Sequence, residues 1–430
     1  MTSQVEAALA RIDALDGEIE AWVHVDREGA LRVAREAGGG PLAGLPFGVK
    51  DIIDVAGLQT RLGAPAFAHH VPEQDATCVA RLRAAGAIVL GKTHTTEFAY
   101  LDPAPTRNPW NREHTPGGSS SGSAAAVAAG MVPLALGSQT VGSVLRPAAY
   151  CGVVGLKATY GLVSYAGVAP LAPSFDHVGV LCRSVAEAAL ALSVLAGYDP
   201  STGSGQARRD PYSVDVALDD YLAAVRDASA PPRLGLVRRY HEEVADAEVR
   251  RHLASVAQAL SAAGAMLREV EMPATAPQIS EAGQPVMRFE AAAAHADRFA
   301  RHKDEYRPSI RGLIEAGIQT SRADYDRSLA WARRLRDELT ERLDGLDALL
   351  LPVAPSAAPR GLASTGSGTF CAPASFSGLP AIALPSGLSE DGLPLAIQLI
   401  AAPFAEARLL AAASWAERAL DFRARPPLPS

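Results

Sequence analysis

The stretch Pro116-Gly-Gly-Ser-Ser-Ser-Gly-Ser-Ala-Ala-Ala-Val-Ala-Ala-Gly130 decides how the rest of the chain is interpreted. By composition alone, a run of glycine and serine is typical of a flexible linker. Here it leads directly into a small-residue helix, expected at about 124–130, and an apolar strand at Val132–Leu136. It is therefore embedded in a core, where glycines let backbone amides approach a ligand closely. The stretch predicts a functional loop.

On either side of this loop, helical patterns alternate with short apolar strands along the whole chain. Buried strands separated by helices are typical of a sheet covered on both faces. We therefore predict an α/β fold with a mixed β-sheet core surrounded by α-helices. Strands are expected at 45–53, 87–90, 132–136, 233–238, 265–271, 347–353, 380–385 and 394–401, and helices at 3–16, 28–37, 75–85, 184–196, 244–263, within 278–345 and at 404–420, with a loop at 199–213.

Composition excludes several classes of function. The 430 residues are 48% hydrophobic and carry a net charge of −7, which gives nucleic-acid binding no electrostatic support. The four cysteines form no CxxC pair, and the ten histidines show no metal-ligand spacing. We therefore expect no metal, no cofactor and no nucleic-acid partner.

Targeting signals are also absent from the pattern. The first 16 residues lack the basic region and apolar core of a signal peptide. The longest apolar stretch, Ala124–Gly137, contains Pro133 and is shorter than the ~20 residues that span a bilayer. We expect a cytoplasmic protein without a membrane segment.

Two stretches match the residue patterns of known motifs, but their neighbouring elements do not fit those motifs. Residues 86–93, GAIVLGKT, fit a phosphate-binding loop, yet the four middle residues would themselves form a strand. Residues 118–122, GSSSG, fit a nucleophile elbow at Ser120, yet no strand precedes them. Both interpretations are disfavoured.

Lysine is rare, at only positions 50, 92, 157 and 303 among 40 basic residues. Arginine stays protonated at any working pH, so a retained lysine can be one that must lose its proton. Lys50 ends an apolar strand and is therefore a candidate base, while Ser119 and Ser143 lie in glycine-rich loops.

Several segments together resemble the amidase signature family of serine amidohydrolases. They are GVKD at 48–51, TRNPWN at 106–111, the stretch at 116–130, GSVLRPAAYCGVVGLK at 142–157, and later segments at 350–355, 378–383 and 392–400. The resemblance covers nearly the whole chain and implies a single domain, 1–430. Within it we expect a signature core at about 45–195 and a helical insert at about 278–345 that shapes the substrate pocket.

The resemblance also implies a Ser-cisSer-Lys triad. Ser143 matches the acylated nucleophile, Ser119 matches the bridging serine after a cis Gly118–Ser119 peptide, and Lys50 matches the terminal base. Such a base must be neutral, and burial can lower a lysine pKa by several units. The backbone N–H groups of Thr140, Val141, Gly142 and Ser143 are adjacent and are the expected oxyanion hole.

The nucleophile loop departs from the family's usual Asp-Thr-Gly-Gly-Ser-Ile-Arg. Gln139 removes a charge, and Val141 disfavours a positive φ, so we expect φ below zero there. Arg146 lies three residues after the serine, which resembles a malonamidase-like branch. It could clamp a substrate carboxylate or pair with a buried acidic side chain.

The expected activity is hydrolysis of the C–N bond of a small carboxamide through a Ser143 acyl-enzyme. Ammonia or an amine would be released, with an acid half-amide as one substrate class. The alternatives are a glutamine-hydrolysing subunit of an amidotransferase, a hydrolase of carbamates or urea derivatives, and a non-catalytic binding protein on the same scaffold. The expected partner is a small-molecule amide, and the sequence leaves a homodimer open.

Overall fold

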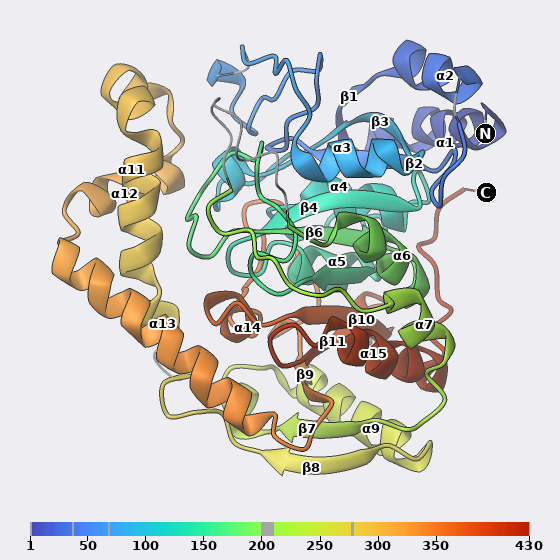
Figure 1. Cartoon of the computed structure of the whole chain (residues 1–430), viewed down its shortest axis with the longest axis vertical. Helices are drawn as coiled ribbons and strands as arrows, with labels where there is room; N and C mark the ends of the chain where they lie inside the picture. Colours follow the sequence, from blue (N-terminus) through green and yellow to red (C-terminus); the bar gives the residue numbers. More distant parts are fainter. Residues whose placement is uncertain (1, 37, 68, 199–209, 277–278, 430) are drawn as a thin grey trace.

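One mixed sheet of eleven strands runs through the molecule (Figure 1). This computed structural model describes residues 2–36, 38–67, 69–198, 210–276 and 279–429. The strands follow the order β1-β3-β2-β4-β6-β5-β10-β11-β9-β7-β8 across the sheet. Their bounds are β1 Trp22–Val25, β2 Pro46–Lys50, β3 Ile88–Thr93, β4 Leu134–Gln139, β5 Val154–Lys157, β6 His177–Cys182, β7 Arg233–Val237, β8 Met266–Val270, β9 Ala348–Pro352, β10 Ala381–Leu388 and β11 Pro394–Ile400.

Strand β2 is flanked on both sides by parallel neighbours. It pairs with β3 through Val49↔Lys92 and with β4 through Val49↔Leu136. Strand β4 is antiparallel to β6, which in turn is antiparallel to β5. The carboxyl ends of β2, β3 and β4 therefore meet at one edge of the sheet, the place where ligands bind in open α/β sheets.

Alternate strand residues face two separate hydrophobic cores. Val49 and Leu136 belong to the core under α3, α6, α9 and α15, whereas Ala135 belongs to the core under α1, α4, α5 and α14. This alternation is the two-residue period of a strand, and it covers the sheet on both faces. The helix bounds are α1 Thr2–Ile19, α2 Arg27–Glu36, α3 Thr77–Ala84, α4 Ser121–Ala128, α5 Leu145–Cys151, α6 Val185–Leu195, α7 Tyr221–Arg226, α8 Arg239–Glu242, α9 Ala247–Ala262, α10 Ile279–Ala282, α11 Gln284–His302, α12 Pro308–Ile318, α13 Arg322–Arg342, α14 Ala372–Phe376 and α15 Glu406–Leu420.

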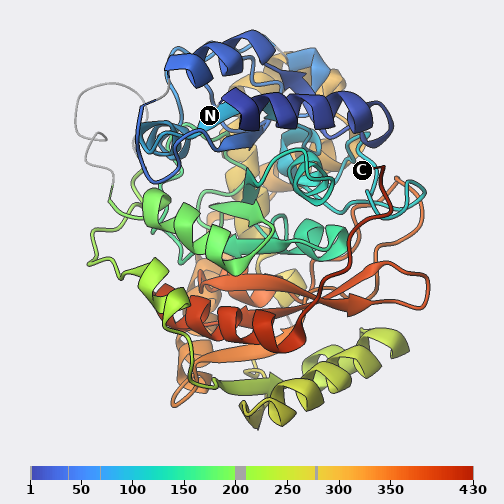
Figure 2. The same ribbon diagram turned by 90° about the vertical axis from the view of Figure 1, so that its right-hand side faces the viewer.

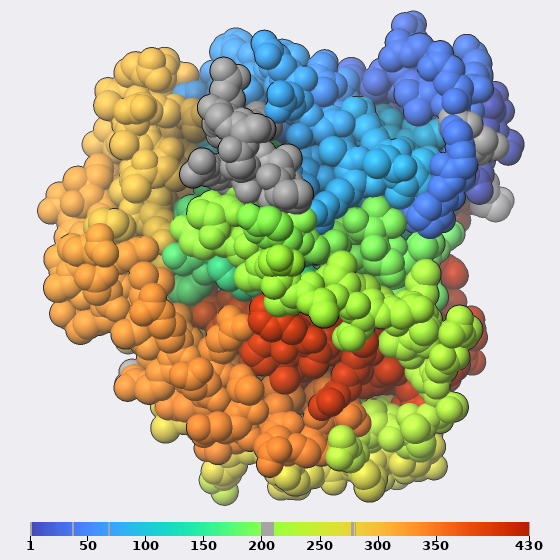
Figure 3. Space-filling model, viewed as in Figure 1, coloured from blue at the N-terminus to red at the C-terminus, as the bar shows by residue number. Residues whose placement is uncertain are grey.

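Helices α11, α12 and α13 stand together beside the sheet. They form the left-hand side of the molecule in Figure 1, and their yellow and orange atoms form the left edge of the face in Figure 3. Seen from the right, α1 and α2 cap the end near β1, while α9 lies at the opposite end (Figure 2). The three helices fall within the segment that the sequence predicts to be helical, 278–345.

The predicted α/β fold with one mixed sheet is confirmed, and the differences are local. Strands β1, β5 and β6 and helices α5, α7, α8 and α14 were not predicted. Two of these strands have only four residues, and none of these helices has more than seven. Helix α4 begins at Ser121, three residues earlier than expected. Residues 37, 199–209 and 278, parts of a predicted helix, loop and helical segment, lie outside the described residues.

Membrane insertion through a helix finds no support in the described part of the chain. None of its helices combines the length and the hydrophobicity that crossing a bilayer requires.

Candidate active site

Three elements bring the predicted triad residues to one edge of the sheet. Lys50 is the last residue of β2, and Ser143 lies in the turn between β4 and α5. Ser119 lies in the loop that precedes α4. The backbone N–H of Ser120 donates to the carbonyl of Ser143 at 3.2 Å, so the two serine loops lie side by side.

The amine end of Lys50 is enclosed by serine oxygens. Its Nζ is hydrogen-bonded to Ser119 Oγ at 2.7 Å, to Ser138 Oγ at 2.8 Å and to the Ser138 carbonyl at 3.4 Å. The side chain is 0% exposed. Burial holds the pKa of Lys50 well below its ordinary value, partly opposed by the charge of Asp176 and reinforced by that of Arg146. The environment therefore favours a neutral amine.

The glycine-serine stretch is a fixed part of the core. The Gly118–Ser119 peptide bond is cis, as the resemblance implied. Ser123 Oγ donates to the Leu136 carbonyl at 2.9 Å, which ties the start of α4 to β4. A Cβ at Gly122 would lie 2.1 Å from the Ala21 carbonyl oxygen, so only glycine fits there. The linker interpretation is therefore wrong.

The turn after β4 presents a row of unused backbone donors. Within the described residues, none of the N–H groups of Thr140, Val141, Gly142 and Ser143 has a hydrogen-bond acceptor. Val141 avoids a positive φ, as expected. Four adjacent N–H groups without partners can bind a negatively charged oxygen.

Gln139 holds this turn in place. Its Oε1 accepts hydrogen bonds from the N–H groups of Val144 and Leu145, at 2.8 and 2.9 Å, at the start of α5. Its Nε2 donates to Ser375 Oγ at 2.9 Å, and that hydroxyl donates to the Val141 carbonyl at 2.6 Å. The sequence showed Gln139 only as a lost charge, whereas the structure shows it as a helix N-terminal brace.

Arg146 is buried and binds backbone carbonyls. Its Nε and Nη2 donate to the Gly118 carbonyl at 3.1 and 2.6 Å, and Nη1 donates to the Gly366 carbonyl at 2.9 Å. The predicted pairing with a buried acidic side chain is wrong, because these partners are carbonyl oxygens. Burial lowers the pKa of Arg146 from its ordinary value. A guanidinium has five N–H donors, so two remain for a ligand.

A cavity of about 230 Å³ opens over the nucleophile turn. Ser143, which is 9% exposed, lines it, whereas Lys50 and Ser119 are fully buried behind it. The other lining residues are mostly small or apolar, and they are Ala99, Tyr100, Leu101, Thr140, Val141, Gly142, Arg146, Leu171, Gln284, Met287, Gly366, Ser367, Gly368, Thr369, Ala372 and Phe376. Tyr100 thus lines the cavity, while its neighbour Phe98 packs in the core.

The carboxylate of Asp176 contacts the turn after β4. Its Oδ1 accepts from Thr140 Oγ1 at 2.6 Å, and its Oδ2 accepts from the N–H groups of Leu171 and Ala172 at 2.8 and 3.0 Å. Burial raises the pKa of Asp176 to about 6, although these hydrogen bonds oppose the rise. The carboxylate therefore positions the turn that carries the unused donors.

The other lysines have different environments. Lys92 is buried and forms an ion pair with Asp51 at 3.1 Å. Lys157 donates to the carbonyls of Leu379 and Ala158, and burial lowers its pKa to about 7. Lys303 is exposed and contacts Glu315 at 2.8 Å. Of the four, Lys50 is the one in contact with a glycine-rich serine loop.

The structure also bears on the two disfavoured motifs, at 86–93 and at Ser120, and on metal binding. Residues 88–93 form strand β3, so no phosphate-binding loop exists at 86–93. Ser120 Oγ is hydrogen-bonded to the backbone of Ser138 and follows no strand. Among the described residues, no three His, Cys, Asp or Glu side chains come together as a metal site.

Known proteins resemble this chain over almost its full length. Residues 3–410 match the Amidase family. The chain is 36% identical to a glutamyl-tRNA(Gln) amidotransferase subunit of Carboxydothermus hydrogenoformans, with 99% of this chain and 96% of that protein covered.

Solved structures agree with the sequence comparison. The structure of 6-aminohexanoate cyclic dimer hydrolase complexed with substrate has a TM-score of 0.90 at 27% identity, covering 99% of this chain and 95% of that one. A chain from a vestigial protein complex, described as revealing the evolutionary origins of an s-triazine catabolic enzyme, has a TM-score of 0.89 at 32% identity, covering 99% and 96%. As its motifs predicted, the chain belongs to the Amidase (amidase signature) family.

Proposed function

We propose that this amidase-signature hydrolase cleaves the C–N bond of a small carboxamide through an acyl-enzyme on Ser143. The observation that carries the proposal is the 2.7 Å hydrogen bond between the fully buried Nζ of Lys50 and Ser119 Oγ, in the loop beside Ser143. A weak hydroxyl nucleophile needs such a base, and a neutral lysine supplies one.

The proton would pass from Ser143 through Ser119 to Lys50. A hydroxyl donates and accepts at once, so Ser119 can relay it. The described residues show no hydrogen bond between the Ser119 and Ser143 side chains, and catalytic hydrogen bonds commonly tighten only when substrate binds. Ser143 Oγ then attacks the carbonyl carbon, and the same proton returns to the leaving nitrogen as the C–N bond breaks. Water hydrolyses the resulting ester and restores the serine.

The oxyanion would lie against the unused donors of residues 140–143. These N–H groups are fixed by Gln139 and Ser375 before substrate arrives. Removing one such donor typically costs about 3 kcal/mol of transition-state stabilisation. The brace at Gln139 therefore supports the rate without touching substrate.

The position of Arg146 favours a substrate that carries a carboxylate. It is the one charged side chain that lines the 230 Å³ cavity among the described residues. Its remaining two N–H donors match a bidentate carboxylate contact. The small volume favours a short acid with a terminal carboxamide, that is, a half-amide of a dicarboxylic acid.

The glutamine-hydrolysing amidotransferase component remains the second candidate. The curated relatives carry an amidotransferase name, so the comparisons favour it over a free hydrolase. The cavity argues in the other direction, because glutamine carries an α-ammonium group, and none of the described lining residues is a carboxylate. Hydrolysis of carbamates and urea derivatives also breaks a C–N bond, so these compounds remain candidate substrates for the experiment below.

We also propose that the helical segment at about 278–345 shapes the substrate pocket. Its helix α11 contributes Gln284 and Met287 to the cavity wall. We propose that this helix limits the length of the acyl group.

The decisive experiment compares glutamine with glutaric acid monoamide, which differs only by lacking the α-ammonium group. Ammonia release is measured with the isolated chain, and shorter half-amides, neutral amides and carbamates complete the panel. We expect faster turnover of the half-amides than of glutamine, and none with Ser143→Ala. A preference for glutamine that needs added partner proteins would assign the second candidate. Full activity of the Ser143→Ala variant would refute the acyl-enzyme.

A further inference from the structure

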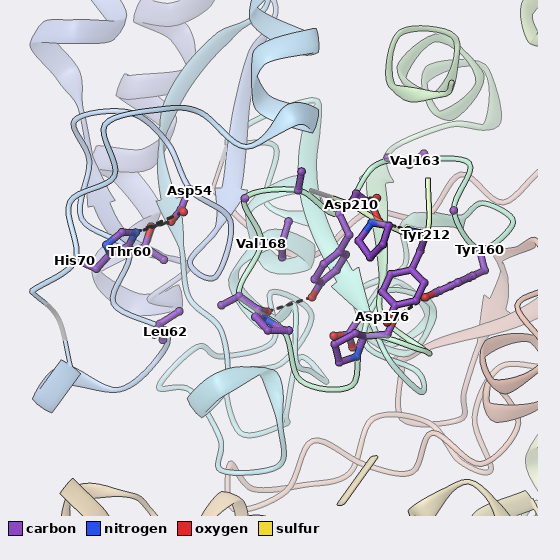
Figure 4. Close-up of a pocket in the computed structure, with 18 of the residues that line it drawn as sticks. Asp54, Thr60, Leu62, His70, Tyr160, Val163, Val168, Asp176, Asp210 and Tyr212 are labelled. Carbon is purple, nitrogen blue, oxygen red and sulfur yellow. Dashed lines mark hydrogen bonds and ion pairs between the residues drawn. The ribbon is translucent and has the colours of Figure 1, made fainter. Parts of the chain in front are cut away.

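A second, larger cavity lies behind the candidate active site. It measures about 590 Å³ and is shown in Figure 4. The chain segment at 169–176 forms the wall between the two spaces, since Leu171 lines the smaller cavity while Pro170, Pro173 and Asp176 line the larger one. Ser143 does not line the larger cavity, so this space is separate from the nucleophile.

Three tyrosines line one end of this cavity. Tyr160 and Tyr212 lie close together, with ring centroids 5.6 Å apart, and Tyr165 lies on the adjoining loop. The Tyr160 hydroxyl donates to the Pro173 carbonyl at 2.6 Å, and the Tyr165 hydroxyl donates to the Ala169 carbonyl at 3.2 Å. These hydrogen bonds hold both rings in place, so the aromatic surface is formed before any ligand arrives.

Carboxylates accompany the tyrosines. Asp54, Asp176 and Asp210 all line the cavity, and each is less than 10% exposed. Asp176 and Asp210 lie on the side of the tyrosines, whereas Asp54 lies at the opposite end, where it accepts from Thr60 Oγ1 and pairs with His70 (Figure 4). Asp210 is fixed by the N–H groups of Tyr165 and Tyr212, at 2.7 and 3.0 Å. A carboxylate offers about four acceptor positions, so Asp210 keeps capacity for a further donor.

The cationic residues do not balance these acids. Arg298 is the one arginine in the described lining, and its guanidinium lies over the Phe67 and Phe98 rings, 5.6 and 5.4 Å from their centroids. Among the described lining residues, three carboxylates outnumber the one arginine, and the imidazole of His70 pairs with Asp54 at 3.4 Å. Burial raises the pKa of Tyr160, and Tyr212 and the carboxylates Asp176, Glu290 and Asp210 raise it further.

We propose that this cavity is a second ligand site that takes a small organic ammonium ion. Tyrosine faces attract a cation at close range, and carboxylates supply its hydrogen-bond acceptors. The volume lies in the usual range for small-molecule pockets, about 300–1,000 Å³. An anion beside the tyrosines would be repelled by Asp176 and Asp210, and a neutral ligand would gain less from these two carboxylates than a cation does. The inference is independent of the proposed hydrolysis, because binding needs no turnover.

Three matched probes test the charge preference. They are 2-phenylethylammonium, uncharged 2-phenylethanol and anionic 3-phenylpropanoate, each titrated calorimetrically into the full chain at pH 7. We expect the ammonium to bind at least ten-fold more tightly than the alcohol, and the carboxylate to show no binding. Equal affinity for all three probes, or no binding of the ammonium, would overturn the proposal.

Variants locate the binding. Tyr212→Leu and Asp210→Asn should each weaken 2-phenylethylammonium binding about ten-fold, and asparagine keeps an acceptor for one of the two loop N–H groups. Tyr198→Leu and Asp215→Asn are the matched controls, because neither residue lines the cavity. Met287→Trp, which fills the smaller cavity, should leave binding unchanged. Loss of binding in Met287→Trp but not in Tyr212→Leu would place the ligand in the active site and refute the second site.

Discussion

Lys50 and Lys92 are neighbours in the sheet with opposite surroundings. Both are 0% exposed, and they lie on the paired strands β2 and β3. Lys92 Nζ lies 3.1 Å from the carboxylate of Asp51, whereas the hydrogen-bond partners of Lys50 Nζ among the described residues are serine oxygens. Burial lowers the pKa of both, but Asp51 opposes the effect at Lys92.

The comparison teaches that burial alone does not make a base. A buried ammonium is retained when a carboxylate contacts it, because the pair compensates the lost hydration. Hydroxyl partners supply no charge, so the surroundings of Lys50 favour the neutral amine. The chain thus uses one residue type for structure on β3 and for proposed chemistry on β2.

The largest expected effect follows replacement of Lys50. Lys50→Met and Lys50→Arg should lower kcat/KM for a half-amide at least 10³-fold, because a general base typically contributes 10²–10⁴-fold and arginine cannot lose its proton. Methionine should also leave the melting temperature unchanged or higher, since it removes a buried amine. Steady-state ammonia release and thermal unfolding are measured on the same samples.

Lys303→Met is the control for this pair, because Lys303 is exposed and its amine contacts Glu315 and the Phe299 ring, neither of which lines the cavity at Ser143. Its rate should match the wild type. Substantial activity in Lys50→Arg would mean that the residue at position 50 works while charged, and the contrast with Lys92 would collapse.

Lys92→Met should lower the stability strongly and the rate only weakly, the reverse of Lys50→Met. It leaves Asp51 buried without its partner, and breaking a buried pair typically costs about 3–5 kcal/mol of unfolding free energy. The rate per folded molecule should change far less than in Lys50→Met. Urea unfolding followed by circular dichroism measures the loss. The double variant Asp51→Asn, Lys92→Met should recover most of the stability, and a double variant no better than the single one would show that the pair is not the cause.

Sequence motifs named the candidate triad residues, but not their surroundings. Lys50, Ser119 and Ser143 stand in recognisable local patterns, so they could be named without a structure. Ser138 contacts Lys50 and Asp176 contacts Thr140. Both contacts depend on the order of strands across the sheet, with β2 next to β4 and β4 next to β6. A single sequence does not specify that order. The same holds for Arg146, whose carbonyl partner Gly366 is 220 residues away.

Asp51 contacts Lys92, whereas Asp176 influences the pKa of Lys50 without contacting it. This difference leads to a smaller, pH-dependent effect on stability. The Asp176 pKa of about 6 exceeds the unfolded value of about 4, so the native state holds the proton more tightly. The free energy of unfolding should therefore fall as pH rises from about 4 to 6, by about 3 kcal/mol at most. Asp176→Asn should remove this dependence. Denaturant titrations at several pH values measure it, and an unchanged slope in the variant would assign the dependence to another group.

Ser138→Ala is expected to have the smallest effect, and it separates the two serine partners of Lys50. Ser138 Oγ lies as close to Nζ as Ser119 Oγ does, but only Ser119 is expected to carry the proton. Loss of one hydrogen bond is typically worth about 1 kcal/mol, so kcat should fall about five- to ten-fold. KM should stay constant because Ser138 does not line the cavity. Ser123→Ala, a buried serine with no contact to Lys50, is the matched control. A loss in Ser138→Ala as large as in Ser119→Ala would make Ser138 the relay instead.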